Sequence, residues 1–318
     1  MAKKKPLVVI TRKLPDAIET RLMELFDVRL NVDDEAMSEA ELTEAVKTAD
    51  VLVPTITDTI DAKLIAAAGK KLKLIANYGT GVDHIDLAAA REKGITVTNT
   101  PDVLTDDVAD LGMAFIIMAP RRIAESERYL RAGKWRQGRM DLGTNLRGKK
   151  LGILGLGRVG SALAKRAQAF GLEIGFHDIA PKPDAPYRRY ASLRSMAADC
   201  DILFVSCQGG PSTRKLVDAA VLNALGPNGF LVNVARGTIV DQQALVAAVR
   251  DKRIAGAAID VFEDEPNAPA ELFNAENIVM TPHIASSTTE TRRAMADLML
   301  ENLRLHFAGQ PVKTPVKL

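Results

Sequence analysis

The chain has 318 residues, of which 47% are hydrophobic and 26% are charged, and its formal net charge is +2. This length predicts two domains, and the composition, with no secretory h-region at the N-terminus, predicts a soluble cytoplasmic protein. The charges are scattered and nearly balanced, which argues against nucleic-acid binding. Two cysteines suggest neither a disulfide framework nor a metal cluster. No apolar run approaches the roughly 20 residues that a bilayer span requires, which argues against a membrane protein.

The N-terminal third alternates between short apolar runs and amphipathic segments. Such alternation is typical of a parallel sheet covered by helices. Strands are predicted at 7–11, 28–31, 51–54, 72–77 and 95–98, and helices at 14–26, 39–48 and 61–68.

A glycine-containing loop, residues 77–83 (NYGTGVD), follows the fourth predicted strand. Gly79 and Gly81 on either side of Thr80 leave backbone N–H groups uncovered, which is one way in which proteins bind a carboxylate. An ordinary strand-to-helix turn explains the same pattern equally well, so both interpretations stay open at this point.

The middle of the chain predicts two helices and a polar segment. Residues 102–118 predict a long buried helix that connects the domains, and residues 121–133 predict a second, more polar helix. The polar segment 135–147 contains the only tryptophan of the chain, Trp135. This residue is either an anchor in an interface with another subunit or a plug in its own subunit.

Residues 149–178 carry the strongest functional signal. A short apolar strand leads into Gly155, Gly157 and Gly160 in the spacing G-x-G-x-x-G, and a helix and a second strand ending at Asp178 follow. The first glycine permits a tight turn, the second permits approach of a pyrophosphate, and the third permits close packing of helix and strand. The acid accepts hydrogen bonds from a ribose diol. This context favours dinucleotide binding over a tight turn in some other α/β fold.

The alternation continues to the end of the chain. Residues 287–290 (Ser-Thr-Thr-Glu) predict a capping box that opens a final long helix reaching about residue 307. The other predicted strands are 201–206, 230–235, 254–261 and 278–281, and the other predicted helices are 192–199, 218–225 and 241–250.

Residues of catalytic types follow several strands of the second half. In an open parallel sheet, ligands bind at the carboxyl ends of the strands. Arg236 suits a carboxylate, and His283 suits proton transfer to a carbonyl oxygen during hydride transfer. Glu263, Asp264 and Glu265 compete as the acid that orients this histidine, and their spacing does not choose among them.

Six stretches, distributed over nearly the whole chain, carry a family resemblance. They are NYGTGVDHID (77–86), TNTPDVLTDDVADL (98–111), GILGLGRVG (152–160), NVARGTIVD (233–241), AIDVFEDEP (258–266) and TPHIASST (281–288). With these stretches the chain resembles the D-2-hydroxyacid dehydrogenases of the glyoxylate/hydroxypyruvate reductase group. Within this group it is most similar to the hydroxyphenylpyruvate/hydroxypyruvate reductases.

The resemblance implies an α/β protein with two parallel-sheet domains, Rossmann-like and flavodoxin-like. A dinucleotide-binding domain, residues 100–284, is expected to be inserted in a substrate-binding (catalytic) domain made of residues 1–99 and 285–318. Family members are usually homodimers in which the stretch equivalent to 121–147 reaches over the partner. That implication favours the interface interpretation of Trp135.

The resemblance also implies roles for five residues at the substrate. Arg236 is expected to bind the substrate carboxylate and carbonyl, and His283 to be the proton donor. The family's glutamate falls on Glu265, which is thereby chosen as the acid. Thr80 and Gly81 match the positions whose backbone amides bind the carboxylate.

The cofactor implied is NAD, with NADP as the alternative and no metal. Arg158 and Val159 match the diphosphate-binding turn, whereas Ala235 and Asp260 match residues that line the nicotinamide. The expected cofactor-binding residues are Gly155, Gly157, Arg158, Val159, Gly160, Asp178, Cys207, Ala235, Asp260, His283 and Thr105.

Two positions depart from the family pattern. Asp178 stands where NADPH-dependent relatives have arginine, and a carboxylate there repels a 2′-phosphate, which favours NADH. Arg188 and Arg189 nearby keep NADPH open as an alternative. Cys207 occupies a position that is often threonine or proline, and we interpret it as a small packing residue rather than a redox group.

The expected function is the reduction of a small 2-oxo acid, such as glyoxylate, hydroxypyruvate or a related acid, to the D-2-hydroxy acid. One alternative is a dehydrogenase for another small acid or oxyanion, such as formate or phosphite. Another is an NAD-sensing binding protein, because the C-terminal-binding corepressors share this scaffold. No nucleic-acid or membrane partner is expected.

Overall fold

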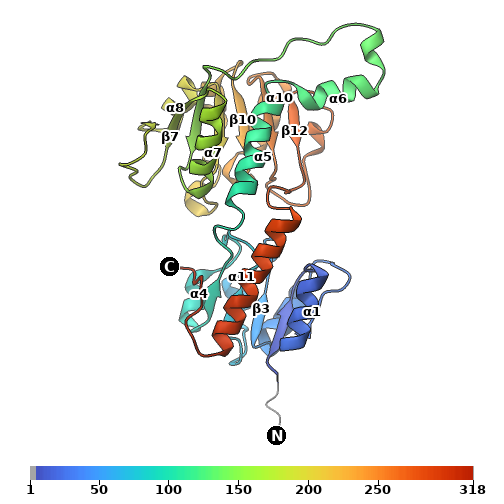
Figure 1. Cartoon of the computed structure of the whole chain (residues 1–318), viewed down its shortest axis with the longest axis vertical. Helices are drawn as coiled ribbons and strands as arrows, with labels where there is room; N and C mark the ends of the chain where they lie inside the picture. The colour runs from blue at the N-terminus through green and yellow to red at the C-terminus, as the bar shows by residue number, and fades with distance from the viewer. Residues whose placement is uncertain (1–4, 318) are drawn as a thin grey trace. The chain divides into compact units, whose positions relative to one another are not determined.

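The computed structural model describes residues 5–317. The chain forms two compact units, which are described separately below. Unit 1 consists of Met1–Leu104 and Thr288–Leu318, and unit 2 consists of Thr105–Ser287, so the chain of unit 1 is interrupted by unit 2 (Figure 1).

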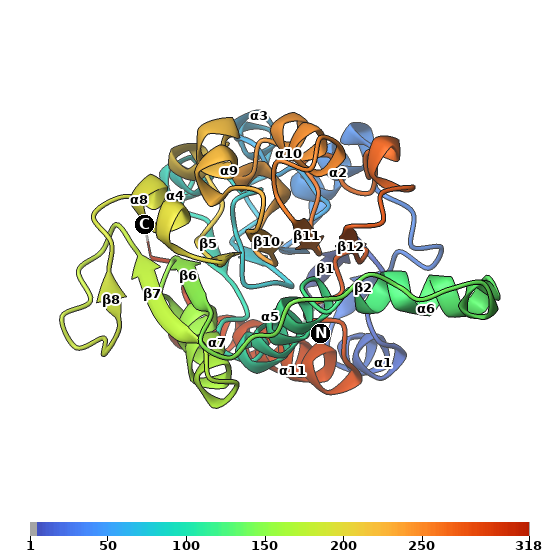
Figure 2. The same cartoon turned by 90° about the horizontal axis from the view of Figure 1, so that it is seen from above.

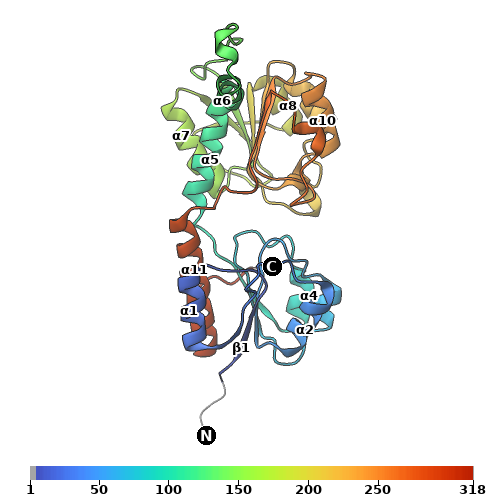
Figure 3. The same ribbon diagram turned by 90° about the vertical axis from the view of Figure 1, so that its right-hand side faces the viewer.

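Unit 1 contains a five-stranded parallel sheet with helices on both faces. The strands lie in the order β2-β1-β3-β4-β5, which is the flavodoxin-like order. Their bounds are Leu7–Ile10 (β1), Asp27–Arg29 (β2), Val51–Val53 (β3), Leu74–Ala76 (β4) and Thr96–Thr98 (β5). Figure 3 shows α1 (Asp16–Leu25) and α11 (Thr289–Phe307) on one face, and α2 (Glu39–Thr48) and α4 (Leu87–Glu92) on the other. The short helix α3 (Ala62–Ala66) packs against α2 and α4.

Unit 2 contains a seven-stranded parallel sheet in the order β12-β11-β10-β9-β6-β7-β8. The order reverses between β6 and β9, which is the switch point of a doubly wound, Rossmann-type sheet. The strand bounds are Lys150–Leu154 (β6), Glu173–His177 (β7), Arg188–Arg189 (β8), Ile202–Val205 (β9), Phe230–Asn233 (β10), Gly256–Ile259 (β11) and Ile278–Met280 (β12).

Helices cover both faces of the unit 2 sheet. In Figure 3, α5 (Thr105–Met118) and α7 (Arg158–Ala169) lie on one face, and α8 (Leu193–Asp199) and α10 (Gln242–Arg250) lie on the other. Helix α9 (Ala219–Leu225) packs between α8 and α10. Strands β9, β10 and β11 are buried along their whole length, as expected for a sheet covered on both sides. The predicted α/β class with two parallel sheets is confirmed.

Three details differ from the sequence prediction. Helix α4 and the two-residue strand β8 were not predicted, because both are too short for a clear periodicity. Helix α7 begins at Arg158, inside the glycine motif and not after it, so that Gly160 lies in its first turn. The cap of α11 is Thr288 and not Ser287, because the Thr288 hydroxyl accepts a hydrogen bond from the Thr291 N–H at 3.2 Å.

The segment 121–147 extends away from the rest of unit 2 (Figures 1 and 2). It contains α6 (Ile123–Arg131), which has no buried residue, and a 3-10 turn at Lys134–Arg136. Trp135 is 71% exposed and Leu142 is 94% exposed. The interpretation of Trp135 as a plug in its own subunit is therefore wrong.

No helix within residues 5–317 is both long enough and apolar enough to cross a membrane.

Candidate functional site

The glycine turn after β6 provides space at the N-terminus of α7. Gly155 has φ +91°, and a Cβ there would lie 2.6 Å from the Cα of Cys207. At Gly160 a Cβ would lie 2.3 Å from the Gly155 carbonyl oxygen. Gly157 differs from both, since a Cβ there would meet no described atom within 4 Å. The open side of the turn therefore lies at Gly157, which is the N-cap of α7.

The first turn of α7 carries Arg158 and Val159. The N–H groups in the first turn of a helix have no partner inside the helix, and the helix dipole makes this end attractive to anions. The open position at Gly157 together with this helix end fits a dinucleotide pyrophosphate.

Asp178 follows β7 and is hydrogen-bonded to the backbone of the glycine turn. One of its carboxylate oxygens accepts a hydrogen bond from the Leu156 N–H at 2.8 Å, and the other accepts one from the Ala180 N–H at 2.8 Å. The Arg189 guanidinium donates to the backbone oxygen of Asp178 at 3.1 Å. Arg188 points elsewhere, since it pairs with Asp199 and stacks on Tyr190.

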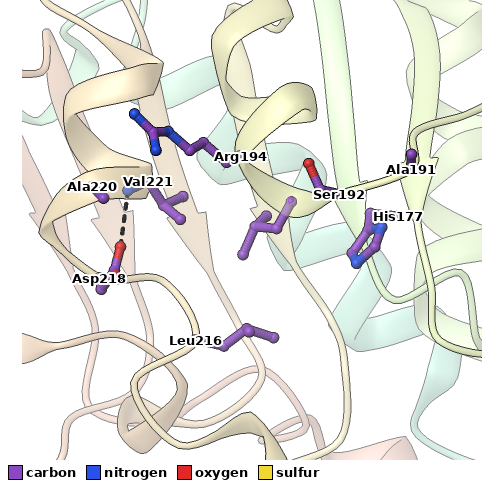
Figure 4. Close-up of a pocket in the computed structure, with 9 residues that line it drawn as sticks. His177, Ala191, Ser192, Arg194, Leu216, Asp218, Ala220 and Val221 are labelled. Atoms are coloured by element: carbon purple, nitrogen blue, oxygen red, sulfur yellow. Dashed lines mark hydrogen bonds between the residues drawn. The ribbon is translucent and has the colours of Figure 1, made fainter.

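A cavity of about 470 Å³ lies beside the end of β7 (Figure 4). His177 enters it from β7, and Arg194 and Asp218 come from the beginnings of α8 and α9. The Nδ1 atom of His177 lies 3.0 Å from the carbonyl oxygen of Tyr190, so it is the protonated nitrogen of the ring. The remaining lining residues are Ala191, Ser192, Leu193, Leu216, Ala220 and Val221. These residues line an open hollow on the surface of unit 2.

Arg236 stands on a turn after β10 that is fixed by Asn233. The Asn233 side chain donates to the Arg236 carbonyl at 3.0 Å and accepts from the Ala235 N–H at 3.0 Å. Arg236 itself donates to the Ala235 carbonyl at 2.7 Å. A Cβ at Gly237 would overlap the backbone of Phe262, so the Arg236 turn packs directly on the loop after β11.

That loop after β11 presents Glu265 to His283. The Nδ1 atom of His283 lies 2.6 Å from one carboxylate oxygen of Glu265, and the Phe262 N–H donates to the other at 3.0 Å. The two side chains are about a quarter exposed. Of the three acids at 263–265, Glu263 instead pairs with Arg214, and Asp264 accepts from Asn267.

The charge state of Glu265 follows from its surroundings. Burial alone would raise its pKa, but the hydrogen bond and charge of His283, the Phe262 N–H and the charge of Arg236 together lower the pKa below its usual value. The ionised carboxylate accepts the Nδ1 proton of His283. The Nε2 atom, which has no partner among the described residues, is then the nitrogen available to a ligand.

Asp260 has a structural role that the sequence did not reveal. It is fully buried, and its carboxylate accepts from the Thr281 hydroxyl at 2.5 Å and from the N–H groups of Ile284 and Ala285 at 2.8 and 2.9 Å. These bonds fix a turn in which His283 has φ +54°, a left-handed conformation that is unfavourable for a histidine. In the sequence, this role was indicated only by the position of an acid at the end of β11, the strand that neighbours β12, which precedes His283.

Thr80 and Gly81 lie in unit 1, on the loop after β4. The Thr80 hydroxyl donates to the Thr100 carbonyl at 2.7 Å, and the Thr80 carbonyl accepts from the Asn99 side chain at 2.8 Å. Among the described residues, no acceptor pairs with the backbone N–H groups of Thr80 and Gly81.

The two remaining predicted cofactor residues are Cys207 and Thr105. Cys207 packs against Gly155, and burial raises the pKa of its thiol to about 11, so the protonated form dominates at neutral pH. Thr105 is the first residue of α5. In the described part of the chain, no group of three or more histidine, cysteine, aspartate or glutamate side chains is placed to hold a metal ion.

Comparison with known proteins places this geometry in a family. Residues 113–285 match the NAD-binding domain of the D-isomer specific 2-hydroxyacid dehydrogenases. A glyoxylate/hydroxypyruvate reductase A from Arabidopsis thaliana is 49% identical over 256 residues, which cover 80% of this chain and 82% of that protein. The chain belongs to the D-2-hydroxyacid dehydrogenase family.

Two further members of this family are similar over nearly the whole chain. A glyoxylate reductase from Thermococcus litoralis is 39% identical over 315 residues, which cover 96% of this chain and 95% of that protein. The NADPH-dependent glyoxylate/hydroxypyruvate reductase of Sinorhizobium meliloti, solved with NADP and malonate, has a TM-score of 0.89 and 38% identity, and the match covers 98% of this chain and 97% of that one. As a D-2-hydroxyacid dehydrogenase, the chain is an NAD(P)-dependent oxidoreductase, as the sequence predicted.

Proposed function

We propose that this chain reduces glyoxylate, hydroxypyruvate or a closely related 2-oxo acid to the D-2-hydroxy acid, with His283 as the proton donor. The observation that carries the proposal is the 2.6 Å contact between His283 Nδ1 and Glu265 on a turn beside Arg236. The names of the relatives, which include reductases of glyoxylate and hydroxypyruvate, support the same substrate class.

Arg236 is proposed to bind the carboxylate and to polarise the C2 carbonyl of the substrate. Its guanidinium is a planar fork that matches a carboxylate in two-point hydrogen bonding. The turn that carries it is held by Asn233 and by the backbone of Phe262, so little ordering is required when the substrate binds. The N–H groups of Thr80 and Gly81 are proposed to bind the substrate carboxylate as well.

His283 is proposed to protonate the carbonyl oxygen from Nε2. The ionised Glu265 accepts from Nδ1 and thereby fixes the ring, while Asp260 fixes the backbone of the turn. The glycine turn would hold the pyrophosphate of the dinucleotide, and its reduced nicotinamide, beside Ala235 and Asp260, would supply the hydride. A positive charge already in place next to the developing alkoxide lowers the barrier without rearrangement of the site.

We propose that NADH is preferred over NADPH. The Asp178 carboxylate, held by the N–H groups of Leu156 and Ala180, suits a free ribose diol and repels a 2′-phosphate. If NADPH is the cofactor instead, Arg189, which donates a hydrogen bond to the backbone of Asp178, is the residue proposed to bind the 2′-phosphate.

Two alternatives have less support. Action on another small acid or oxyanion requires a different pocket on the same scaffold, and the relatives named above are 2-oxo acid reductases. The NAD-sensing corepressors keep the same three residues as Arg236, Glu265 and His283, so these residues do not decide against a binding protein; the relatives named above, which are reductases, give it less support. We propose further that the chain is a homodimer and that it is cytoplasmic, for the reasons given by the family resemblance and the composition.

A substrate panel tests the proposed function. Initial rates with glyoxylate, hydroxypyruvate and an aryl pyruvate, each with NADH and NADPH, should give turnover with at least one of these acids and a higher kcat/KM with NADH. Chiral analysis of the product should give the D-enantiomer. Absence of turnover with all three acids, together with turnover of formate or phosphite, would favour the first alternative.

A further inference from the structure

Asn77 lies beneath the loop that is proposed to bind the substrate carboxylate. It directly follows β4, is only 1% exposed, and its backbone N–H extends the pairing with β5 by donating to the Thr98 carbonyl at 2.9 Å. Its side chain therefore starts from a rigid position on the sheet and not from the mobile part of a loop.

The Asn77 amide group holds two carbonyls of this loop at once. Its Nδ2 atom donates to the carbonyl oxygens of Gly79 and Gly81, each at 2.9 Å. The Gly79 carbonyl also accepts from the Thr100 N–H at 3.0 Å. The Thr80 carbonyl, which lies between these two, accepts a hydrogen bond from the Asn99 side chain.

The backbone carbonyls of the loop are consequently all paired, whereas its backbone N–H groups are available to a ligand. All three carbonyls of residues 79–81 accept hydrogen bonds from protein donors. The N–H groups of residues 79–82, in contrast, pair with no acceptor among the described residues. Consecutive unpaired N–H groups of this kind form a concave site for an anion.

His84 determines the orientation of the Asn77 amide. Because Nδ2 of Asn77 is used by two carbonyls, Oδ1 is left as an acceptor for His84 Nε2 at 3.0 Å. The ring nitrogen must then carry a proton at Nε2, since Oδ1 cannot donate. The backbone of His84 is itself fixed, because its carbonyl accepts from the Ile60 N–H at 2.9 Å.

We propose that Asn77 is a positioning residue for the substrate carboxylate and that His84, through its Nε2–H, keeps the Asn77 amide in the required orientation. This inference rests on the proposed function, because it assigns the anion at the loop to the carboxylate of the 2-oxo acid. Because the Asn77 side chain bonds the loop carbonyls and His84, both residues are assigned an effect on substrate binding and not on hydride or proton transfer.

The first test is Asn77→Asp in the full-length enzyme. The substitution keeps the size of the side chain but removes both donated hydrogen bonds and places a negative charge under the loop. We expect KM for glyoxylate and the inhibition constant of oxamate to rise at least about tenfold, with a much smaller change in kcat. The dissociation constant for NADH should stay the same.

Asn31→Asp is the matched control. The Asn31 side chain also donates to two carbonyls, those of Thr11 and Glu35, but it follows β2, which is separated from β4 by two strands. It should leave KM unchanged. A KM for Asn77→Asp equal to that of wild type, or an equal effect of both substitutions on KM, would overturn the proposal.

The second test compares His84→Gln with His84→Leu, so that the proposal stays testable if Asn77→Asp does not fold. Both substitutions remove the imidazole, but only glutamine retains an N–H that reaches Asn77. We expect KM to stay close to the wild-type value in His84→Gln and to rise several-fold in His84→Leu. Equal KM values for the two variants would reject the role of His84.

The proposed function is tested separately by the wild-type enzyme. If wild type reduces none of the 2-oxo acids, the proposed function fails, whatever the variants do. If wild type is active and the variants behave like it, only the positioning role fails.

Discussion

At the scale of single residues, the proposed reaction depends on a histidine whose backbone and ring are each held by a different acid. Asp260 fixes the left-handed turn at His283, and Glu265 fixes the ring. The turn forces His283 into its unfavourable conformation, and three hydrogen bonds to one buried carboxylate offset the cost of that conformation.

His283→Ala should lower kcat by about 100- to 10,000-fold, because it removes the proposed proton donor for the carbonyl oxygen. Binding of NADH should change far less than turnover, since most of the expected cofactor-binding residues, among them the glycine turn after β6, are left intact. Stopped-flow measurement of NADH oxidation, with NADH binding followed by fluorescence, checks both expectations. A variant with undiminished turnover would show that another group donates the proton.

Cys207 should be chemically inert in the folded enzyme. Burial raises the pKa of its thiol to about 11, from a usual value of about 9, so at pH 8 the reactive thiolate is about a hundredfold less populated than in an ordinary cysteine. The other cysteine, Cys200, is more deeply buried, and its pKa is raised to about 12. Native protein should therefore react slowly with a thiol-specific reagent at pH 8 and show two rapid thiols after unfolding. One rapid thiol in the native state would support a redox role instead.

At the scale of elements, the glycine turn shows why one spacing serves both folding and binding. Gly155 and Gly160 must be glycine because neighbouring protein atoms leave no room for a Cβ, whereas Gly157 faces open space. The sequence motif treats the three glycines alike, but the structure separates two packing positions from one that a ligand can approach.

Gly157→Ala should weaken NADH binding by tenfold or more and leave the thermal transition nearly unchanged. The added methyl group meets no protein atom but occupies space that the phosphates need. Gly160→Ala is the contrasting variant, since its methyl group would lie 2.3 Å from the Gly155 carbonyl oxygen and should destabilise the fold by about 2 kcal/mol. Calorimetry combined with NADH titration separates the two effects. The idea is wrong if Gly157→Ala unfolds the protein or binds NADH normally.

Most elements were predictable because parallel strands are continuous apolar runs and their helices have clear periodicity. Helix α2 was predicted with its observed bounds, and the structure shows Ser38 capping its N-terminus. Helix α4 and strand β8 were missed because six and two residues are too few to show a period. At α11 two adjacent hydroxyl residues compete for the cap, and only the backbone conformation selects Thr288.

The candidate site was predictable in part. The strand-end rule indicated Arg236 and His283, but the choice among residues 263–265 required a resemblance, since only the path of the loop brings Glu265 to the imidazole. The roles of Asp260 and Asn77 depend on hydrogen bonds between segments far apart in sequence or within a tightly folded loop. No periodicity or spacing reports such bonds.

At the scale of the whole molecule, segment 121–147 is the part that its own unit does not bury. Ile123, Leu130, Trp135 and Leu142 are between 42% and 94% exposed. Apolar side chains of this size on an extended segment are typical of a surface that another subunit covers.

Trp135→Glu should therefore weaken the proposed homodimer, because it places a charge where an apolar contact is expected. Sedimentation analysis should show a shift towards monomer at micromolar concentration. Phe170→Glu, at the end of α7, is the control, since Phe170 is also exposed, at 49%, but lies outside the segment. A monomeric wild-type protein, or equal dissociation of both variants, would count against this interface.

The interrupted path of unit 1 has a consequence for synthesis on the ribosome. One of its hydrophobic clusters combines residues of α1 and β1 with Met295, Met299 and Leu303 of α11, which are translated after all of unit 2. The nascent chain thus carries an incomplete apolar surface while all of unit 2 emerges and folds. This cluster cannot be completed before α11 has been synthesised, so we expect the apolar face of the unit 1 sheet to need protection by chaperones during translation.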